Sequence, residues 1–325
     1  MRTRMLIGVG LVVALAAAGV TALRVTAGGR QGGSGVTSTQ PVRARPLTIG
    51  LWGDIPYTTA DRARVLGTID SMNAAKLDLS VFDGDFKGGG PCDDRVYTEA
   101  IDRFDQLDAP AVYVPGDNEW TDCRDGGRDV ANERLAHLRS VMFARPDSFG
   151  RRTMALDHQS RAYPENLRWQ MGGVVFVTVH VVGSNNHRAD PAEATARDAA
   201  NRDWLHDSFA LAGRIGAVGV MVVTQADPSF EVVNPADRAT LGVDGIDPFV
   251  DALRDETVRF GRPVALVHGD GHRYRLDHPL LDRSGVPVPN LVRLETFGTP
   301  DVSWVKATID TSDPQVFRFD IRRVG

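Results

Sequence analysis

Val267-His268-Gly269-Asp270-Gly271-His272 follows an apolar run that begins at Pro263. The apolar residues predict a buried strand, and the glycines allow the backbone to bend tightly after it. Asp270 and His272 are therefore expected together at the carboxyl end of a strand. A carboxylate and an imidazole in that place are candidates for a functional site.

Three earlier segments repeat this layout of apolar strand, glycine and aspartate. They are Ile49 to Asp54, Leu79 to Asp85 and Val112 to Asp117. Helical patterns separate them, and the order β-α-β-α-β-α predicts parallel strands joined by right-handed crossovers. Ligands bind at the carboxyl ends of the strands in such sheets. We therefore expect the aspartates to lie at that edge.

The second half of the chain repeats the theme less regularly. An antiparallel pair is predicted around Gly172-Gly173, and apolar strands are predicted at Val218 to Thr224 and Pro263 to Val267. Three short alternating runs near the C-terminus predict antiparallel strands that close a second sheet. These runs are 291–296, 303–309 and 316–321. The expected fold class is α/β, a four-layer α/β/β/α sandwich of two mixed sheets flanked by helices.

The N-terminal segment does not have the pattern of a folded domain. Arg2 and Arg4 precede an uncharged apolar run from Met5 to Leu23, and small residues that permit cleavage follow or end it. This pattern favours a signal peptide in residues 1–27, with an uncleaved membrane anchor as the alternative. We therefore expect a secreted or cell-envelope protein that contacts a membrane only through residues 5–23, if this segment is left uncleaved.

The rest of the chain divides into a linker and one domain. Residues 28–46 are rich in Gly, Ser, Thr and Gln and predict a flexible linker. Residues 47–325 are enough for one large α/β domain. The formal charge is −5, and removal of residues 1–27 with their three arginines takes it to −8. This negative charge argues against nucleic-acid binding.

The two cysteines, Cys92 and Cys123, each follow an aspartate strand end by a few residues. If the two strands are neighbours, their loops lie close enough for a disulfide, which export permits. Two buried free thiols are the alternative.

If the four strand-end aspartates and His272 share one cleft, the negative charge of the carboxylates must be neutralised. Like charges at close range repel and raise each other's pKa. A bound divalent cation solves this problem, and oxygen donors with one imidazole favour manganese, magnesium or iron over zinc. The alternative is that the aspartates are dispersed as helix caps or turn formers.

The order of these motifs resembles that of the calcineurin-like metallophosphoesterases. That family has Asp-x-His after the first strand, Gly-Asp after the second and Gly-Asn-His-acid after the third, followed by a lone histidine and Gly-His-x-His. The matching segments here are Gly53-Asp54-Ile55-Pro56, Gly84-Asp85, Gly116-Asp117-Asn118-Glu119, Gln225 and Gly269-Asp270-Gly271-His272. The resemblance covers most of residues 47–325 and implies the metallo-dependent phosphatase-like fold.

Five positions depart from the family pattern. They are Pro56, Asp117, Asn118, Gln225 and Asp270. Two of them are carboxylates and two are amides, so only the proline offers no ligand. The chain therefore resembles a divergent subgroup with an oxygen-rich site.

The resemblance implies two divalent ions and a role for each ligand. Asp85 would bridge the ions, and Asp54 and His272 would hold the first. The ligands implied for the second are Asp117, Asp270 and Gln225. Metal-bound hydroxide would then attack phosphorus in line with the leaving group.

Asn118 and His272 are the candidate catalytic residues. The Asn118 amide can bind a phosphoryl oxygen but cannot donate a proton at neutral pH, so general acid catalysis by this position is expected to be lost. His180, Asn185 and Asn186 are the further candidates for substrate binding. A structural role, in a hydrogen-bonded core or a turn, is the alternative for these three.

The leading hypothesis is an exported metal-dependent phosphoesterase that hydrolyses a small phosphomonoester or phosphodiester. The alternative is a catalytically silent protein of the same fold that binds a ligand or partner at the cell envelope. A hydrolase with a single metal ion that acts on a different bond is a third possibility.

Overall fold

The computed structural model describes residues 45–126 and 128–324. The signal peptide or anchor expected in residues 1–27, and the expected linker as far as residue 44, lie outside these ranges. Within them, none of the helices combines the length and the apolar character that a membrane crossing requires.

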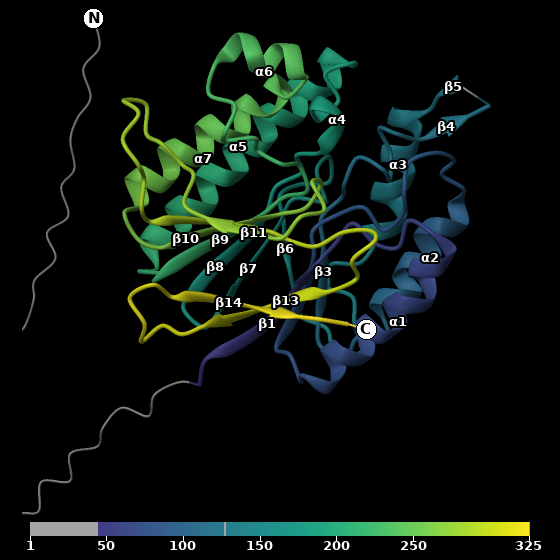
Figure 1. Cartoon of the computed structure of the whole chain (residues 1–325), viewed down its shortest axis with the longest axis horizontal. Coiled ribbons are helices and arrows are strands. Elements are labelled where there is room, and N and C mark those ends of the chain that lie inside the picture. The colour runs from purple at the N-terminus through teal and green to yellow at the C-terminus, as the bar shows by residue number, and fades with distance from the viewer. Residues whose placement is uncertain (1–44, 127, 325) are drawn as a thin grey trace, which may run out of the picture. The chain divides into compact units, whose positions relative to one another are not determined.

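Two large sheets form the centre of the described part (Figure 1). The first has the strand order β14-β13-β1-β2-β3, and the second has the order β11-β12-β10-β9-β8-β7-β6. The strands of the first are β1 (Leu47–Trp52), β2 (Leu79–Phe82), β3 (Ala111–Tyr113), β13 (Trp304–Ile309) and β14 (Phe317–Arg322). Those of the second are β6 (Asp157–His158), β7 (Leu167–Met171), β8 (Val174–Thr178), β9 (Gly219–Val223), β10 (Val264–His268), β11 (Arg275–Asp277) and β12 (Leu291–Glu295). A separate small hairpin joins β4 (Arg124–Asp125) to β5 (Arg128–Asp129).

Helices cover the outer face of each sheet (Figure 1). Those of the first half are α1 (Thr59–Ala74), α2 (Asp94–Phe104) and α3 (Ala131–Met142). Those of the second half are α4 (Gly183–Asn186), α5 (Pro191–Arg214), α6 (Pro235–Leu241), the 3-10 turn η1 (Asp244–Ile246) and α7 (Asp247–Phe260). The two mixed sheets between helices confirm the expected α/β fold class.

The residues of β8 show how the layers pack. Val174 and Phe176 lie in the core that the two sheets share, whereas Val175 and Val177 lie in a second core with Leu205 of α5. Successive side chains of a strand point to opposite faces. All five residues of β8 are buried, as expected for a strand covered on both sides.

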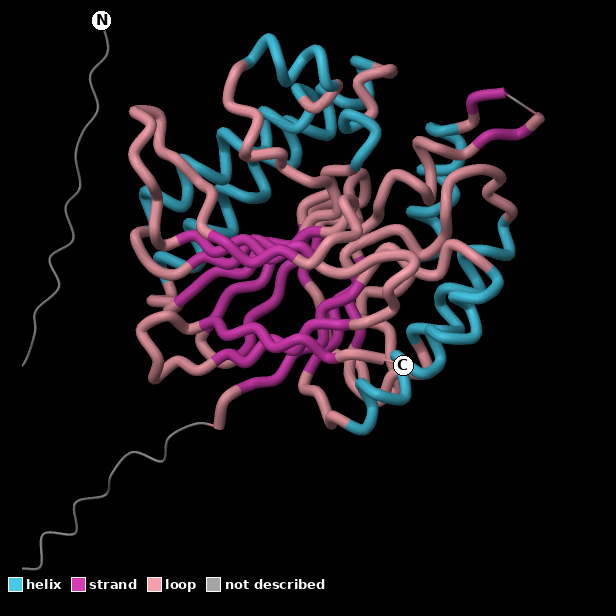
Figure 2. The backbone as a smooth tube through the Cα atoms, viewed as in Figure 1, coloured by secondary structure: helices cyan, strands magenta, loops and turns pink. Residues whose placement is uncertain are grey.

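Parallel pairing brings the strand ends together. β1, β2 and β3 run parallel, as do β8, β9, β10 and β12. The loops that follow these strands gather at one end of the two sheets (Figure 2). The aspartate segments of the sequence lie in these loops.

The three C-terminal runs do not close one sheet together, so this part of the expectation was wrong. β12 pairs in parallel with β10, whereas β13 pairs antiparallel with β1 and β14 with β13. The chain thus returns from the second sheet to the first after β12. Alternating hydrophobicity indicates which face of a strand is buried but does not name the partner strand.

Candidate metal centre

The backbone turns sharply at three of the strand-end aspartates. Asp54, Asp85 and Asp270 have φ values of 51°, 63° and 72°. This left-handed region is uncommon for residues other than glycine, and strained residues of this kind cluster at functional sites. Gly116 makes room for the turned acids, because a Cβ there would lie only 2.0 Å from Asp85 Oδ1.

Three of the predicted ligands meet around the hydroxyl of Tyr57. Its Oη lies 3.2 Å from Asp54 Oδ1, 2.8 Å from Asp85 Oδ2 and 3.2 Å from His272 Nε2. His272 Nε2 is 3.5 Å from Asp54 Oδ1, and its Nδ1 lies 2.9 Å from the carbonyl oxygen of Thr299. We call Asp54, Tyr57, Asp85 and His272 the tyrosine cluster.

The other predicted ligands meet around the amide of Gln225. Its Nε2 lies 3.2 Å from Asp85 Oδ2 and 3.3 Å from both Asp117 Oδ1 and Asp270 Oδ1. Its Oε1 accepts the N–H of Gly183 at 2.7 Å. We call Asp85, Asp117, Gln225 and Asp270 the glutamine cluster. Asp85 belongs to both clusters.

The charges of the clusters are buried and poorly balanced. Burial, reinforced by the charge of Asp117, raises the pKa of Asp85 well above its usual range, and the same causes raise the pKa of Asp270 to about 8. Beside them, Asp83 is fully buried and its Oδ1 has no hydrogen-bond partner. Burial and the neighbouring Asp54 raise the pKa of this carboxyl as well.

The side chains of Tyr57 and Gln225 alone do not carry enough protons for these contacts. The Tyr57 hydroxyl has one proton for the Asp54 and Asp85 oxygens, and the Gln225 amide has two protons for three carboxylates. A buried carboxylate without a proton, a donor or a cation is strongly unfavourable. The backbone N–H groups of Asn118, Asp227 and Asp270 also donate to these carboxylates, so added protons or a bound cation would offset their like charges and not a lack of donors.

The donor atoms of the tyrosine cluster fit one divalent cation. Their contacts range from 2.8 to 3.5 Å, and an octahedral ion with ligands at about 2.1 Å separates neighbouring ligands by roughly 3 Å. Oxygen donors with one imidazole suit manganese, iron or magnesium. Across residues 45–126 and 128–324, no group of three or more His, Cys, Asp or Glu side chains is arranged to hold a metal ion. A cation at this position would therefore need the phenol oxygen of Tyr57 as a ligand beside Asp54, Asp85 and His272.

Known structures share this architecture. A dimetal phosphatase from Danio rerio is 12% identical, with a TM-score of 0.50 over 87% of this chain and 100% of its own. The chain has the calcineurin-like metallophosphoesterase fold. GAP50, the anchor in the inner membrane complex of Plasmodium, is 10% identical with a TM-score of 0.50 over 87% of this chain and 90% of its own. No family model and no curated protein matches the sequence.

Asn118 is the one predicted substrate-binding residue that the metallophosphoesterase fold brings to the clusters. Its Nδ2 donates to Asp85 Oδ2 at 2.7 Å and to Tyr57 Oη at 3.0 Å, and its backbone N–H donates to Asp85 Oδ1 at 3.0 Å. Asn118 therefore positions the Asp85 carboxylate, which the two clusters share.

His180, Asn185 and Asn186, the other candidates for substrate binding, form hydrogen bonds to residues outside the two clusters. His180 is fully buried, with Nδ1 2.9 Å from Glu165 Oε1. Asn186 is fully buried and donates to Asp198, and Asn185 donates to Asp244. Asn185 and Asn186 therefore have partners within the fold, whereas His180 Nε2 is buried without a hydrogen-bond partner. The sequence pattern at this turn did not distinguish pocket lining from loop support.

The same turn brings Ser184 to the glutamine cluster. Residues 184–187 have four consecutive positive φ values between 49° and 58°, although left-handed helical backbone costs roughly 1–2 kcal/mol per residue. Buried Arg197 holds the turn by donating to the carbonyl of Asn186 at 3.1 Å. The turn places Ser184 Oγ 2.8 Å from Asp117 Oδ2.

Tyr57 and Lys87 are site residues that sequence reasoning missed. Lys87 Nζ donates to the carbonyl of Asn118 at 2.6 Å and lies close enough to Asp85 and Asp117 to feel their charges. The available signals were a tyrosine directly after Pro56 and one of only three lysines in the chain. Neither signal shows by itself where the side chain points.

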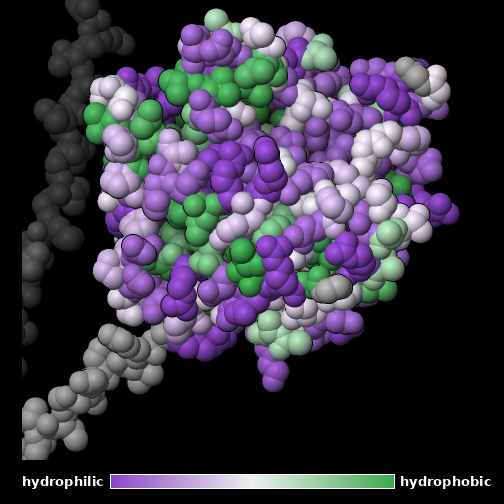
Figure 3. Space-filling view, in the orientation of Figure 1, coloured by the Kyte–Doolittle hydropathy of each residue, from purple (hydrophilic) through white to green (hydrophobic). Residues whose placement is uncertain are grey.

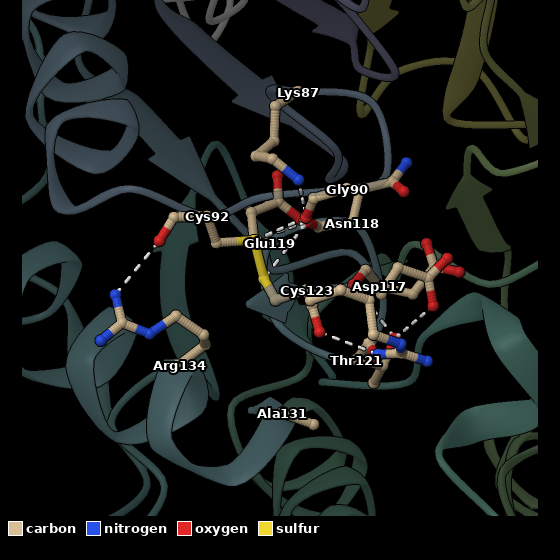
Figure 4. Close-up of a disulfide and its surroundings, with 12 residues drawn as sticks. Lys87, Gly90, Cys92, Asp117, Asn118, Glu119, Thr121, Cys123, Ala131 and Arg134 are labelled. Carbon is tan, nitrogen blue, oxygen red and sulfur yellow. Dashed lines mark hydrogen bonds between the residues drawn. A yellow bond between two sulfur atoms is a disulfide. The ribbon is translucent and has the colours of Figure 1, made fainter. Parts of the chain in front are cut away.

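The predicted disulfide between Cys92 and Cys123 is confirmed (Figure 4). The two Cα atoms are 5.5 Å apart, and the bond joins the loops that follow β2 and β3. Both sulfur atoms lie within 3.8 Å of the Asn118 carbonyl oxygen. Glu119 secures the same loop by accepting the N–H of Gly116 at 2.9 Å. The disulfide therefore braces the segment that carries Asp117 and Asn118.

Proposed function

We propose that this chain is an exported metal-dependent phosphoesterase that hydrolyses a small phosphomonoester or phosphodiester. The main support is the tyrosine cluster, in which Asp54, Asp85 and His272 all lie close to the hydroxyl oxygen of Tyr57. The metallophosphoesterase fold, which a dimetal phosphatase shares, supports the reaction class. A disulfide and the apolar run at residues 5–23 support export.

A cation in the tyrosine cluster would polarise a phosphoryl oxygen and lower the pKa of its bound water. The residues of the chain hold and orient this centre. The Thr299 carbonyl accepts the Nδ1 proton of His272, which turns Nε2 toward the cluster. Asn118 fixes Asp85 through two hydrogen bonds. Lys87 adds a positive charge beside a strongly acidic centre, which favours an anionic substrate.

The test of this proposal is cation-dependent hydrolysis. Purified protein is stripped with a chelator, and Mn²⁺, Fe²⁺, Mg²⁺ or Zn²⁺ is returned singly while hydrolysis of 4-nitrophenyl phosphate and bis(4-nitrophenyl) phosphate is followed. We expect Mn²⁺ or Fe²⁺ to restore activity in the wild type but not in Asp54→Asn. Asp102→Asn, an exposed acid on α2, is the matched control. The absence of hydrolysis with every ion would overturn the proposal.

Esters with good leaving groups are expected to react best. Asn118 stands where the resembled family has the histidine that protonates the leaving group, and an amide cannot do so. Loss of general acid catalysis typically costs about 10²–10⁴-fold. We expect kcat/KM for an alkyl phosphate such as glycerol phosphate to fall below that for 4-nitrophenyl phosphate by about this factor. Similar values for the two esters would mean that another group supplies the proton.

Cation affinity is expected to rise with pH between about 6 and 9. Burial and Asp117 raise the pKa of Asp85. Burial lowers the pKa of His272, but the nearby Asp54 outweighs it and raises the pKa to about 9. At low pH an incoming cation must displace the protons that both ligands hold, and at high pH these protons are gone. Calorimetry in two buffers of different ionisation enthalpy should show proton release, and a flat affinity across this range would contradict the account.

The second candidate function is a catalytically silent binding protein. The Gln225 amide favours it, because this side chain fills the centre of the glutamine cluster without a cation. GAP50, an anchor in a membrane complex, shares the fold. On the face shown in Figure 3, however, hydrophobic side chains reach the surface in separate groups rather than in one continuous patch. Cation binding without hydrolysis of any ester would favour this candidate.

A further inference from the structure

We infer that this centre is built for one cation, with Tyr57 as a ligand, and that the Gln225 amide occupies the position of a second. The inference rests on the cation of the proposed function but not on hydrolysis. It departs from the two ions that the family resemblance implies. Two separate observations carry it, one at each cluster.

The first observation is that Tyr57 replaces a missing donor. Pro56 stands at the place of a histidine ligand and has no side-chain donor, but the next residue brings its Oη to 2.8–3.2 Å from Asp54, Asp85 and His272. The phenol oxygen is a hard donor like the carboxylates around it. With a cation bound, the Tyr57 oxygen would hold it as a phenolate, and the hydroxyl proton would be released to solvent.

Packing holds Tyr57 in this position. Its ring meets the His272 ring edge-on, with the centroids 5.0 Å apart. Gly88 also lies against this side chain, since a Cβ built on it would be in van der Waals contact with Tyr57 Cβ at 3.4 Å. The hydroxyl is also fixed by the Nδ2 of Asn118 at 3.0 Å. The oxygen is therefore preorganised among the acids rather than free to turn outward.

The second observation is that the Gln225 amide fills the place in the glutamine cluster where a second cation would bind. The Nε2 atom faces Asp85, Asp117 and Asp270, and an amide nitrogen carries two protons and no free lone pair for a metal. The amide oxygen accepts the N–H of Gly183 at 2.7 Å. Turning the amide over would set its NH₂ group against that N–H. Gln225 is thus a donor to the acids and not the ligand that the resemblance implied.

Close packing prevents Gln225 from swinging aside. A Cβ on Gly84 would lie 2.5 Å from Gln225 Cγ and 2.7 Å from its Cβ, so the side chain lies directly against this glycine. Gln225 itself is fully buried. Opening the second position would require movement of the loop after β2 as well as of the glutamine.

Cation stoichiometry tests the inference. Purified protein free of metal is titrated with Mn²⁺ by calorimetry, and bound metal is measured after gel filtration by elemental analysis. We expect one equivalent for the wild type and two for Gln225→Glu, which keeps the Gly183 contact and presents an oxygen to the second position. Gln225→His is the second variant if Gln225→Glu does not fold. Two equivalents or none in the wild type, or one in both variants, would overturn the inference.

Tyr57→Phe tests the ligand at the first position. It removes one oxygen and keeps the ring contact with His272, so Mn²⁺ affinity should fall at least about tenfold. A near-ultraviolet difference band of ionised tyrosine should appear when the wild type binds metal and should be absent in Tyr57→Phe. Tyr163→Phe, outside both clusters, is the matched control and should retain both signals. Unchanged affinity in Tyr57→Phe would exclude the tyrosine as a ligand, whether or not the protein hydrolyses an ester.

Discussion

Replacing Asp85 with asparagine is expected to lower kcat/KM for phosphoester hydrolysis by about 10³-fold or more, since a bound metal supplies several kcal/mol of transition-state stabilisation. Asp85 alone belongs to both clusters. Its Oδ2 faces the Tyr57 hydroxyl at 2.8 Å and the Gln225 amide at 3.2 Å. Asparagine keeps the shape of the side chain but removes the charge that holds a cation.

The variant Asp117→Asn, measured in the same way, shows which of the two clusters binds the cation. This variant removes a buried carboxylate from the glutamine cluster and leaves the four residues of the tyrosine cluster intact. We expect Mn²⁺ affinity to fall far more in Asp85→Asn than in Asp117→Asn. Thermal unfolding of each variant shows whether it folds. Equal losses of affinity would mean that the cation does not lie in the tyrosine cluster.

Removing the disulfide is expected to lower the free energy of unfolding by about 3–4 kcal/mol. The bond closes a loop between residues 31 positions apart, and this loss of constraint on the unfolded chain sets the magnitude. The double variant Cys92→Ser, Cys123→Ser should also bind Mn²⁺ more weakly, because the bridge braces the turn of Asp117 and Asn118. Denaturant unfolding and calorimetry measure the two effects.

Reduced wild-type protein is the control for that variant. It should unfold at the same denaturant concentration as the double serine variant, because both lack the same bond. A loss of stability below about 1 kcal/mol would contradict the loop-closure argument. Weaker cation binding at unchanged stability would show that the disulfide serves only to position the site.

Local sequence patterns located the strand-end acids and the general architecture. Asp54, Asp85 and Asp270 each follow an apolar strand and a glycine, so position along the chain was enough to place them at one edge. The disulfide followed from the same reasoning, since neighbouring strand ends brought Cys92 and Cys123 together. The resemblance to a known family depended on the order of these local motifs.

The contacts between distant segments could not be predicted from the sequence. The orientation of the Gln225 amide depends on the N–H of Gly183, and the inward path of Tyr57 depends on the turn at Asp54 and on contact with His272. The Asn186 amide donates to Asp198 of α5, a contact that the sequence pattern at this turn does not show. Each of these features is fixed by tertiary packing, which neither composition nor periodicity contains.

A crystal structure of the Mn²⁺-loaded protein tests the central claim most directly. An anomalous difference map would locate the metal without reference to activity. We predict a single peak bonded to Asp54, Tyr57, Asp85 and His272, with the Gln225 amide still against Asp117 and Asp270. Two peaks bridged by Asp85, or no peak in the tyrosine cluster, would contradict it.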